Sequence, residues 1–211
     1  MAKILITSGP TRQYIDPVRY ISNASSGTMG RCLAEAAIAH GHDVVIVSGP
    51  VMVEYPQAAE VVPVISTEDM LLECLRLFPD CDGLIGAAAP CDYRPIEVAD
   101  HKIRKTGETL SIKMVETEDV VARLGSAKSE SQWTVGFALE SEDARFRALS
   151  KLIRKSCDLV VVNGVEAIDS ANNSIEIISG EGKIVAQCSG SKSEVADVVL
   201  STIVKHLLTT Q

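Results

Sequence analysis

The 211-residue sequence predicts an α/β protein, in which helices cover both faces of a mostly parallel sheet. Short apolar runs alternate along the chain with amphipathic stretches, as in parallel sheets that are buried on both faces. Glycines and capping residues separate these runs. Apolar residues make up 46% and charged residues 23%, the balance of a globular protein large enough to bury a core.

The first half of the chain is expected to alternate strands and helices. A helix rich in Ala ends before Gly41, and a second is capped by Ser66 or Thr67, with acidic residues in its first turn. The expected helices cover about 27–39 and 67–77, and the expected strands are 3–8, 44–48, 61–65 and 83–88.

After Ala89 the pattern changes. Residues 90–105 hold two prolines, several charges and no periodicity, which predicts a long ordered loop of the kind that is often functional. Thr117 is expected to cap a short helix, and Ser191 with Glu194 has the spacing of a capping box at the final helix. The remaining elements are strands at 110–115, 134–138 and 159–162, a helix at 141–157, and a hairpin of 174–178 with 184–187.

These elements predict a Rossmann-like three-layer sandwich with a flap loop and a C-terminal hairpin. We find neither an internal repeat nor a linker, so we expect one domain over residues 1–211, with the flap at about 90–115. The parallel strands and their helices would form its core.

Composition excludes several functional classes. The net charge of −8, with one Trp and three Phe, argues against nucleic-acid binding. No apolar run approaches the ~20 residues of a membrane span. The start enters a strand without a charged leader, and the six cysteines form no C-x-x-C pair, so we expect a cytoplasmic protein with reduced thiols.

The glycine-rich start is not a dinucleotide-binding fingerprint. That motif needs G-x-G-x-x-G directly after the strand, whereas the first strand ends at Ser8 and the helix opens only near Gly27. The stretch 22–27 still places hydroxyls, an amide and backbone N–H groups at a helix start, which suits an anion. The alternative is that Ser25 or Ser26 only caps the helix.

Two groups of cations stand out on this acidic chain. One is the loop group Lys102, Arg104 and Lys105. The other is in the second half of the expected helix at 141–157 and comprises Arg147, Lys151, Arg154 and Lys155. Of these, Arg147, Lys151 and Lys155 are four apart and would share one helical face. Like charges at that spacing repel, and an anionic ligand such as a triphosphate would offset the repulsion. The alternative is that cations at a helix C-terminus complement its dipole.

Four segments together resemble a known family. They are ITSGPTRQYIDPVRYISNASSGTMG, AAAPCDYRP, HKIRK, and VGFALE followed by KLIRKSCDLVVVN. In this order they resemble the motifs of phosphopantothenoylcysteine synthetase, over nearly the whole chain. The resemblance implies a ligase of coenzyme A biosynthesis that joins 4′-phosphopantothenate to cysteine through an acyl-nucleotidylate, with CTP as co-substrate.

The resemblance also implies roles for residues. Lys102 matches the lysine that forms the acyl-nucleotidylate, Asn23 the asparagine that supports the cysteine step, and Arg19 a contact to substrate phosphate or carboxylate. Ser25, Ser26 and Gly27 would complete the substrate site. The nucleotide site would comprise Gly86, Ala87, Ala88, Asp92, Lys102, Thr117, Glu118, Asp119, Val120, Phe137, Lys151 and Lys155.

Mg²⁺ is expected to arrive with the triphosphate, because it keeps water and phosphate ligands, so we name no metal residue. Asp16 could bind the ion or turn the chain before Pro17. The resemblance further implies a homodimer and a possible separate phosphopantothenoylcysteine decarboxylase.

The chain departs from many members at 117–119, where they carry Asn-Pro-Asp, and at Pro90-Cys91. A short-chain oxidoreductase is a rival interpretation, but it would need a Tyr-x-x-x-Lys pair, which is absent. A non-catalytic nucleotide-binding module is another, and it could dispense with Lys102 and Asn23.

Overall fold

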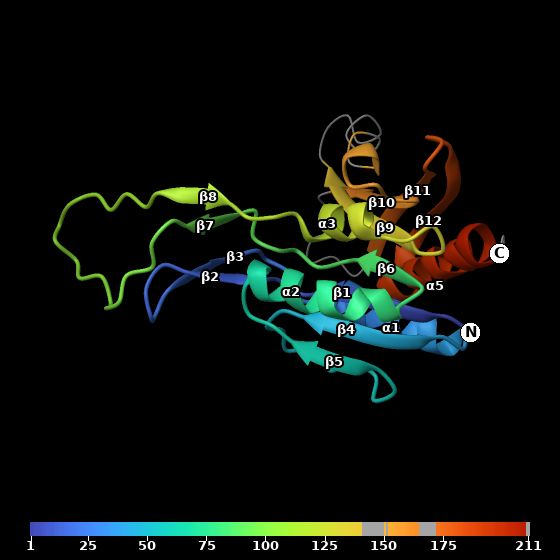
Figure 1. Cartoon of the computed structure of the whole chain (residues 1–211), viewed down its shortest axis with the longest axis horizontal. Helices are drawn as coiled ribbons and strands as arrows, with labels where there is room; N and C mark the ends of the chain where they lie inside the picture. Colours follow the sequence, from blue (N-terminus) through green and yellow to red (C-terminus); the bar gives the residue numbers. More distant parts are fainter. Residues whose placement is uncertain (141–149, 151, 165–171, 210–211) are drawn as a thin grey trace.

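The computed structural model describes residues 1–140, 150, 152–164 and 172–209 (Figure 1). Eight strands form one sheet in the order β12-β11-β10-β9-β6-β1-β4-β5. Neighbours from β5 to β10 pair in parallel, whereas β11 and β12 are antiparallel. This confirms the mostly parallel sheet and the C-terminal hairpin. The strands are β1 (Lys3–Ser8), β4 (Asp43–Ser48), β5 (Glu60–Pro63), β6 (Gly83–Gly86), β9 (Trp133–Glu140), β10 (Leu159–Gly164), β11 (Asn172–Ser179) and β12 (Ile184–Ser191).

Helices cover both faces of this sheet, which confirms the three layers. Ile4 and Ile6 of β1 pack in one core with α1 (Thr28–Ala39) and α5 (Lys192–Ile203). Leu5, between them, packs on the other face with α2 (Thr67–Leu77) and α3 (Val120–Ala127). Side chains of a strand alternate between faces, so one apolar strand serves both cores. Short helical turns follow α2 as η1 (Phe78–Asp80) and α5 as η3 (Val204–Leu208).

Two helix starts agree with the expected caps and one does not. Ser66 and Asp69 form a capping box at α2, and Ser191 and Glu194 form another at α5. The predicted cap of α3 is wrong, because Asp119 rather than Thr117 accepts the backbone N–H of Ala122, at 3.1 Å.

Two small antiparallel ribbons extend beyond the sheet (Figure 1). The first pairs β2 (Arg12–Tyr14) with β3 (Tyr20–Ser22), and the second pairs β7 (Tyr93–Pro95) with β8 (Met114–Glu116). The expected strand at 110–115 is wrong in its start, because β7 offers only three residues and pairs no further than Met114. Residues 96–113 form the loop between β7 and β8, and we call this loop the flap loop.

The expected helix at 141–157 lies largely outside the described residues. Residues 152–154 are helical, and Lys155 and Ser156 form a turn. Ser156 has φ 51°, a left-handed conformation that ends a helix. Cys157, the expected last residue of the helix, is therefore not helical. None of the helices in the described part of the chain is long and apolar enough to cross a membrane.

Candidate active site

The strand order changes direction at β1. The chain passes from β1 through α1 to β4 on one side, and from β5 through α2 to β6 on the other. In such sheets, the carboxyl ends of the two strands at the switch flank a crevice where ligands bind. Here these ends are Ser8 of β1 and Gly86 of β6. The predicted nucleotide backbone, Gly86 to Ala88, therefore lies at the switch point.

Backbone and side-chain bonds hold this crossing together. The N–H of Ala88 donates to Thr7 Oγ1 at 3.3 Å, and the N–H of Ala89 donates to the Gly9 carbonyl at 2.9 Å. The hydroxyl of Ser8 donates to the Gly27 carbonyl at 3.2 Å, which brings the start of α1 to the same edge. The structure thus places two predicted groups, 86–88 and the start of α1, side by side.

Phe137 lies at the same edge on the neighbouring strand. It follows Gly136, which is in register with Gly86 in the parallel pair of β6 and β9. A Cβ on Gly86 would lie 2.4 Å from Val121 Cγ2, so only glycine lets α3 pack this close to β6. The phenyl ring is half-buried against the core shared with α1.

Asn23 spans the crevice from the other side. Its Nδ2 donates to the carbonyls of Ala89 and Pro90, at 3.1 and 2.9 Å. Two acceptors fix the orientation of the amide, with Oδ1 turned away from them. No described residue donates a hydrogen bond to Oδ1, and the side chain is exposed, so this oxygen can accept from a ligand.

The start of α1 has no side-chain cap. Gly27 is the N-cap residue, with φ 79°, and has no side-chain capping bond. Ser26 Oγ accepts the N–H of Thr28 only at a long 3.4 Å. Ser26 instead shares a hydrogen bond of 2.8 Å with the Thr28 hydroxyl. Neither Ser25 nor Ser26 is therefore the N-cap residue. N–H groups in the first turn of an uncapped helix suit an anion.

A buried threonine–cysteine network supports the crevice, and sequence reasoning missed it. Thr11 Oγ1 lies 2.9 Å from Thr67 Oγ1 and accepts the N–H of Cys91 at 2.8 Å. The Thr117 hydroxyl donates to the Cys91 carbonyl at 2.7 Å, and the Thr117 N–H to the Asp92 carbonyl at 2.9 Å. Two predicted nucleotide residues, Asp92 and Thr117, are thereby held together. Thr residues near the expected ends of strands and helices were the only signal in the sequence.

Cys91 is not a nucleophile in this arrangement. Its side chain is buried, and its Sγ donates to the Thr11 carbonyl at 3.4 Å. Burial raises the pKa of the Cys91 thiol, which opposes thiolate formation.

Lys155 meets the predicted 117–120 segment. Its Nζ lies 2.9 Å from Asp119 Oδ2. Burial by itself raises the pKa of Asp119, but the Lys155 charge and the Ala122 N–H outweigh it and lower that pKa overall. Val120 is buried, and Glu118 pairs with Arg123 at 3.3 Å. The predicted residue Lys151 lies outside the described residues.

Lys102 and Arg19 belong to a second region, around the flap loop. Lys102 is exposed on this loop. Arg19 Nε donates to Asp16 Oδ2 at 2.9 Å, and its Nη2 donates to the Ile103 carbonyl at 2.9 Å. Asp16 also accepts the N–H groups of Val18 and Arg19, so it turns the chain. The flap loop, which carries Lys102, extends away from the sheet (Figure 1), whereas Lys155 pairs with Asp119 at the start of α3.

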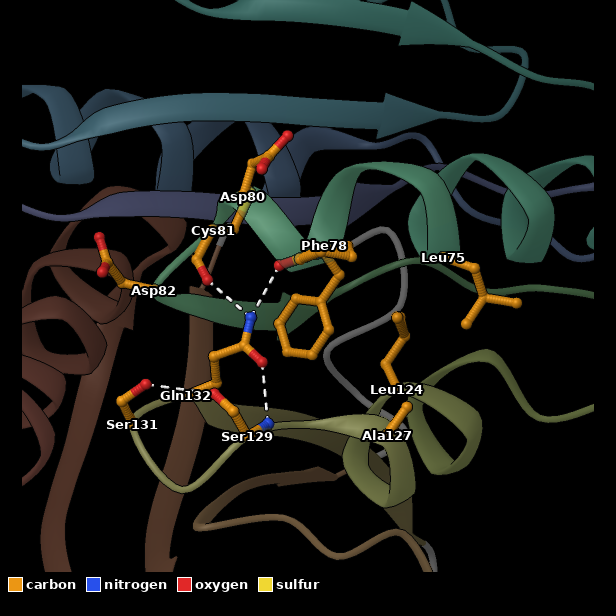
Figure 2. A pocket seen from close by; sticks show the side chains of 11 residues that line it. Leu75, Phe78, Asp80, Cys81, Asp82, Leu124, Ala127, Ser129, Ser131 and Gln132 are labelled. Carbon is orange, nitrogen blue, oxygen red and sulfur yellow. Dashed lines mark hydrogen bonds between the residues drawn. The ribbon is translucent and has the colours of Figure 1, made fainter.

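A hollow of about 510 Å³ lies elsewhere, at the amino ends of β6 and β9 (Figure 2). Gln132 crosses it, donating from Nε2 to the Phe78 and Cys81 carbonyls at 2.7 and 2.8 Å. Its Oε1 accepts the Ser129 N–H at 2.9 Å. None of the predicted site residues lines this hollow, and the Gln132 amide is already satisfied on both sides.

Comparison with known proteins gives a consistent result. Residues 1–207 match the family described as DNA/pantothenate metabolism flavoprotein C-terminal domain. The chain is 36% identical over 208 residues to the coenzyme A biosynthesis bifunctional protein CoaBC of Haemophilus influenzae, covering 96% of this chain and 51% of that protein. It is 42% identical over 165 residues to the CoaBC protein of Bacillus subtilis, covering 78% of this chain and 40% of that protein.

A solved structure of the C-terminal domain of a CoaBC protein has the same fold. It is 33% identical, with a TM-score of 0.85, and the match covers 100% of this chain and 97% of that one. The present chain spans about half the length of the curated relatives it matches.

Proposed function

We propose, because the chain belongs to the DNA/pantothenate metabolism flavoprotein C-terminal domain family, that it is a phosphopantothenate–cysteine ligase of coenzyme A biosynthesis. The observation that carries the proposal is the match over residues 1–207, together with the CoaBC relatives. The start of α1, whose N-cap residue is a glycine, and the strand ends at the switch point support a phosphate-bearing ligand.

The proposed reaction has two steps. A carboxylate oxygen of 4′-phosphopantothenate attacks the α-phosphorus of CTP, and the bond to the β-phosphate oxygen breaks. This step yields an acyl-CMP and pyrophosphate. The cysteine amine then attacks the acyl carbon, the bond from this carbon to the CMP oxygen breaks, and the amine loses a proton. A carboxylate is a poor electrophile, so activation supplies a good leaving group, while the protein positions groups and neutralises charge.

Each residue role follows from its place. Asn23 Oδ1 would accept from the cysteine amine while Nδ2 stays on the Ala89 and Pro90 carbonyls. Lys102 would neutralise charge on the α-phosphate during the first step. The backbone at 86–88 and Phe137 would hold the nucleoside at the carboxyl edge.

We further propose a homodimer in which the flap loop of one copy completes the site of the other. Two properties support it. The flap loop extends away from its own sheet (Figure 1). Both ribbons and the flap loop expose large apolar side chains, namely Val18, Tyr20, Ile21, Tyr93, Ile96, Val98, Leu110 and Val115. Many exposed apolar side chains on such extensions favour an interface. A phosphopantothenoylcysteine decarboxylase, separate or attached, would use the product.

Mg²⁺ is proposed to enter as the complex with CTP. Among the residues that the structure describes, no group of three or more His, Cys, Asp or Glu could hold a metal ion. The Asp16 carboxylate is occupied by its own turn and by Arg19. No step of the reaction is therefore assigned to a metal-binding residue of the chain.

Pyrophosphate release tests this function. The purified protein is incubated with 4′-phosphopantothenate and either CTP or ATP, with Mg²⁺ and with or without cysteine. We expect release with CTP, and the ligated product only when cysteine is present. Lys102→Gln should abolish release because it removes the cation at the α-phosphate. Asn23→Asp should still release pyrophosphate but form no product. A carboxylate cannot donate to the Ala89 and Pro90 carbonyls, so it loses the orientation in which it would accept from the cysteine amine.

Full turnover by both variants would contradict the roles assigned to Lys102 and Asn23. Absence of pyrophosphate release with every nucleoside triphosphate would contradict the ligase itself. Lys113→Gln is the matched control, since it removes an exposed cation from the same loop, outside the group around Lys102, and is expected to keep most activity.

A further inference from the structure

The Asp16 side chain is fully buried and divides its two oxygens between two segments. Oδ1 accepts the backbone N–H groups of Val18 and Arg19, at 2.9 and 2.8 Å. Oδ2 accepts from the Arg19 guanidinium and, at 3.1 Å, from the N–H of Ile103. Oδ1 thus shapes the turn between β2 and β3, whereas Oδ2 reaches the flap loop, 87 residues further along the chain.

Ile103 is held on both sides of its backbone. Its N–H is bound by Asp16, and its carbonyl accepts Arg19 Nη2 at 2.9 Å. A third bond, from the N–H of Ala99 to the Ile15 carbonyl at 3.1 Å, ties the same part of the loop to the same turn. Lys102 precedes Ile103 directly, so these bonds fix the peptide unit that follows the lysine. We call this set of bonds the flap clasp.

Charge strengthens the flap clasp. The Arg19 guanidinium, with the N–H groups of Val18, Ile103 and Arg19, holds the pKa of Asp16 far below its usual range despite the opposing effect of burial. The carboxylate therefore stays ionised at neutral pH. Hydrogen bonds to an ionised group are about twice as strong as neutral ones.

We propose that Asp16 is a positioning residue, which orients Lys102 by clasping Ile103 and Arg19 against the β2–β3 turn. This inference rests on the proposed function, because that function gives Lys102 its role in the first step. Asp16 itself touches no reacting atom. Its effect on the reaction passes through the backbone at 102–103, and a misplacement of about 1 Å can lower a rate by roughly a hundredfold.

Asp16→Asn separates the two duties of the side chain. The remaining Oδ1 still serves the turn, but an NH₂ group replaces Oδ2 and meets three N–H donors. We expect kcat for pyrophosphate release to fall between tenfold and a hundredfold, with KM for CTP changed less than threefold. Amide hydrogen exchange at 99–105 should become faster, and exchange in β1 and β6 should not.

Ile103→Pro provides an independent variant, because it deletes the N–H donor and leaves the carboxylate intact. Ile103→Ala is its control, since it trims the side chain and keeps the donor. We expect Ile103→Pro to resemble Asp16→Asn, Ile103→Ala to stay within about threefold of wild type, and the double variant to be no worse than either single one. Non-additivity of this kind marks two groups that act through one interaction.

The inference and the function fail differently. If the wild-type protein turns over and Asp16→Asn with Ile103→Pro keep its kcat, Asp16 does not position Lys102, and the ligase assignment stands. If no triphosphate yields pyrophosphate, the function and the role of Asp16 in it both fall. Amide hydrogen exchange at 99–105 can be measured whether or not the protein is active. Unchanged exchange rates in both variants would show that the flap clasp does not hold this loop.

Discussion

Gly27 occupies a position that other residues would strain. Its φ of 79° is in the left-handed region, and a Cβ there would lie 2.8 Å from Val51 Cγ1. The glycine lets α1 begin directly beside Ser8, at the end of β1. Gly41, past the end of α1, has the same φ but nothing within 4 Å of a Cβ. The two glycines therefore share one backbone requirement and differ only in their surroundings.

We expect Gly27→Ala to destabilise the protein more than Gly41→Ala. Both variants pay about 1–2 kcal/mol for a left-handed non-glycine residue. Gly27→Ala must in addition displace Val51, which costs further packing energy. The free energy of unfolding from urea denaturation measures both. Equal losses would show that space at Gly27 does not matter.

The sequence could identify single residues better than their partners. Asn23 and Lys102 follow from motifs, but the bond from Asp16 to Ile103 spans 87 residues and leaves no local pattern. The two alternatives for Asp16 were metal binding and a turn, and the five backbone and side-chain donors around its carboxylate decide for the turn. The serines before α1 look like caps in sequence, yet the cap is Gly27.

At the level of elements, α3 depends on one carboxylate. Asp119 caps its first turn through the Ala122 N–H and pairs with Lys155, which comes from the turn before β10. The helix is only eight residues long, so propensity contributes little to it. The cap and the packing of Val120 and Leu124 hold it against the sheet.

Two variants separate the cap from the ion pair. Asp119→Asn keeps an N-cap acceptor and loses the charge, whereas Asp119→Ala loses both. We expect Asp119→Ala to lower the free energy of unfolding by about 1 kcal/mol more than Asp119→Asn at pH 7. Chemical denaturation of both variants measures this difference. Equal losses of unfolding free energy would show that the Asp119 cap does not stabilise α3.

The same comparison has a pH dependence. The folded pKa of Asp119 is lowered, so its charge stabilises the protein fully above the pKa of the unfolded chain, about 3.9. This contribution is lost as pH falls through the folded value. The gap between wild type and Asp119→Asn should therefore shrink below about pH 4.

Elements with local signals were predictable, and short ones were not. The capping boxes of α2 and α5 lie within four residues and could be read directly. The ribbons β2–β3 and β7–β8 have three residues per strand, too few for any periodicity. Thr117 resembles a cap in the sequence, but it lies two residues before the true cap, Asp119. Its hydroxyl donates to the Cys91 carbonyl instead.

At the scale of the molecule, the order of strands places the proposed site. Alternating apolar runs predict a parallel sheet, but they do not say which strands are neighbours. Pairing of β1 with both β4 and β6 creates the switch point, and Gly86 to Ala88 with Asn23 lie there. The hollow of Figure 2 lies at the opposite, amino ends of the strands, so the two regions can be distinguished by experiment.

The central claim is that the nucleotide binds at the carboxyl ends of β1 and β6. Amide hydrogen exchange with and without CTP and Mg²⁺ tests it most directly. The account predicts slower exchange at 27–31 and 86–92, where the start of α1 meets the end of β6. Exchange at 78–82 and 129–132, around the hollow of Figure 2, should not change. Protection confined to the hollow, with none at the carboxyl edge, would contradict it.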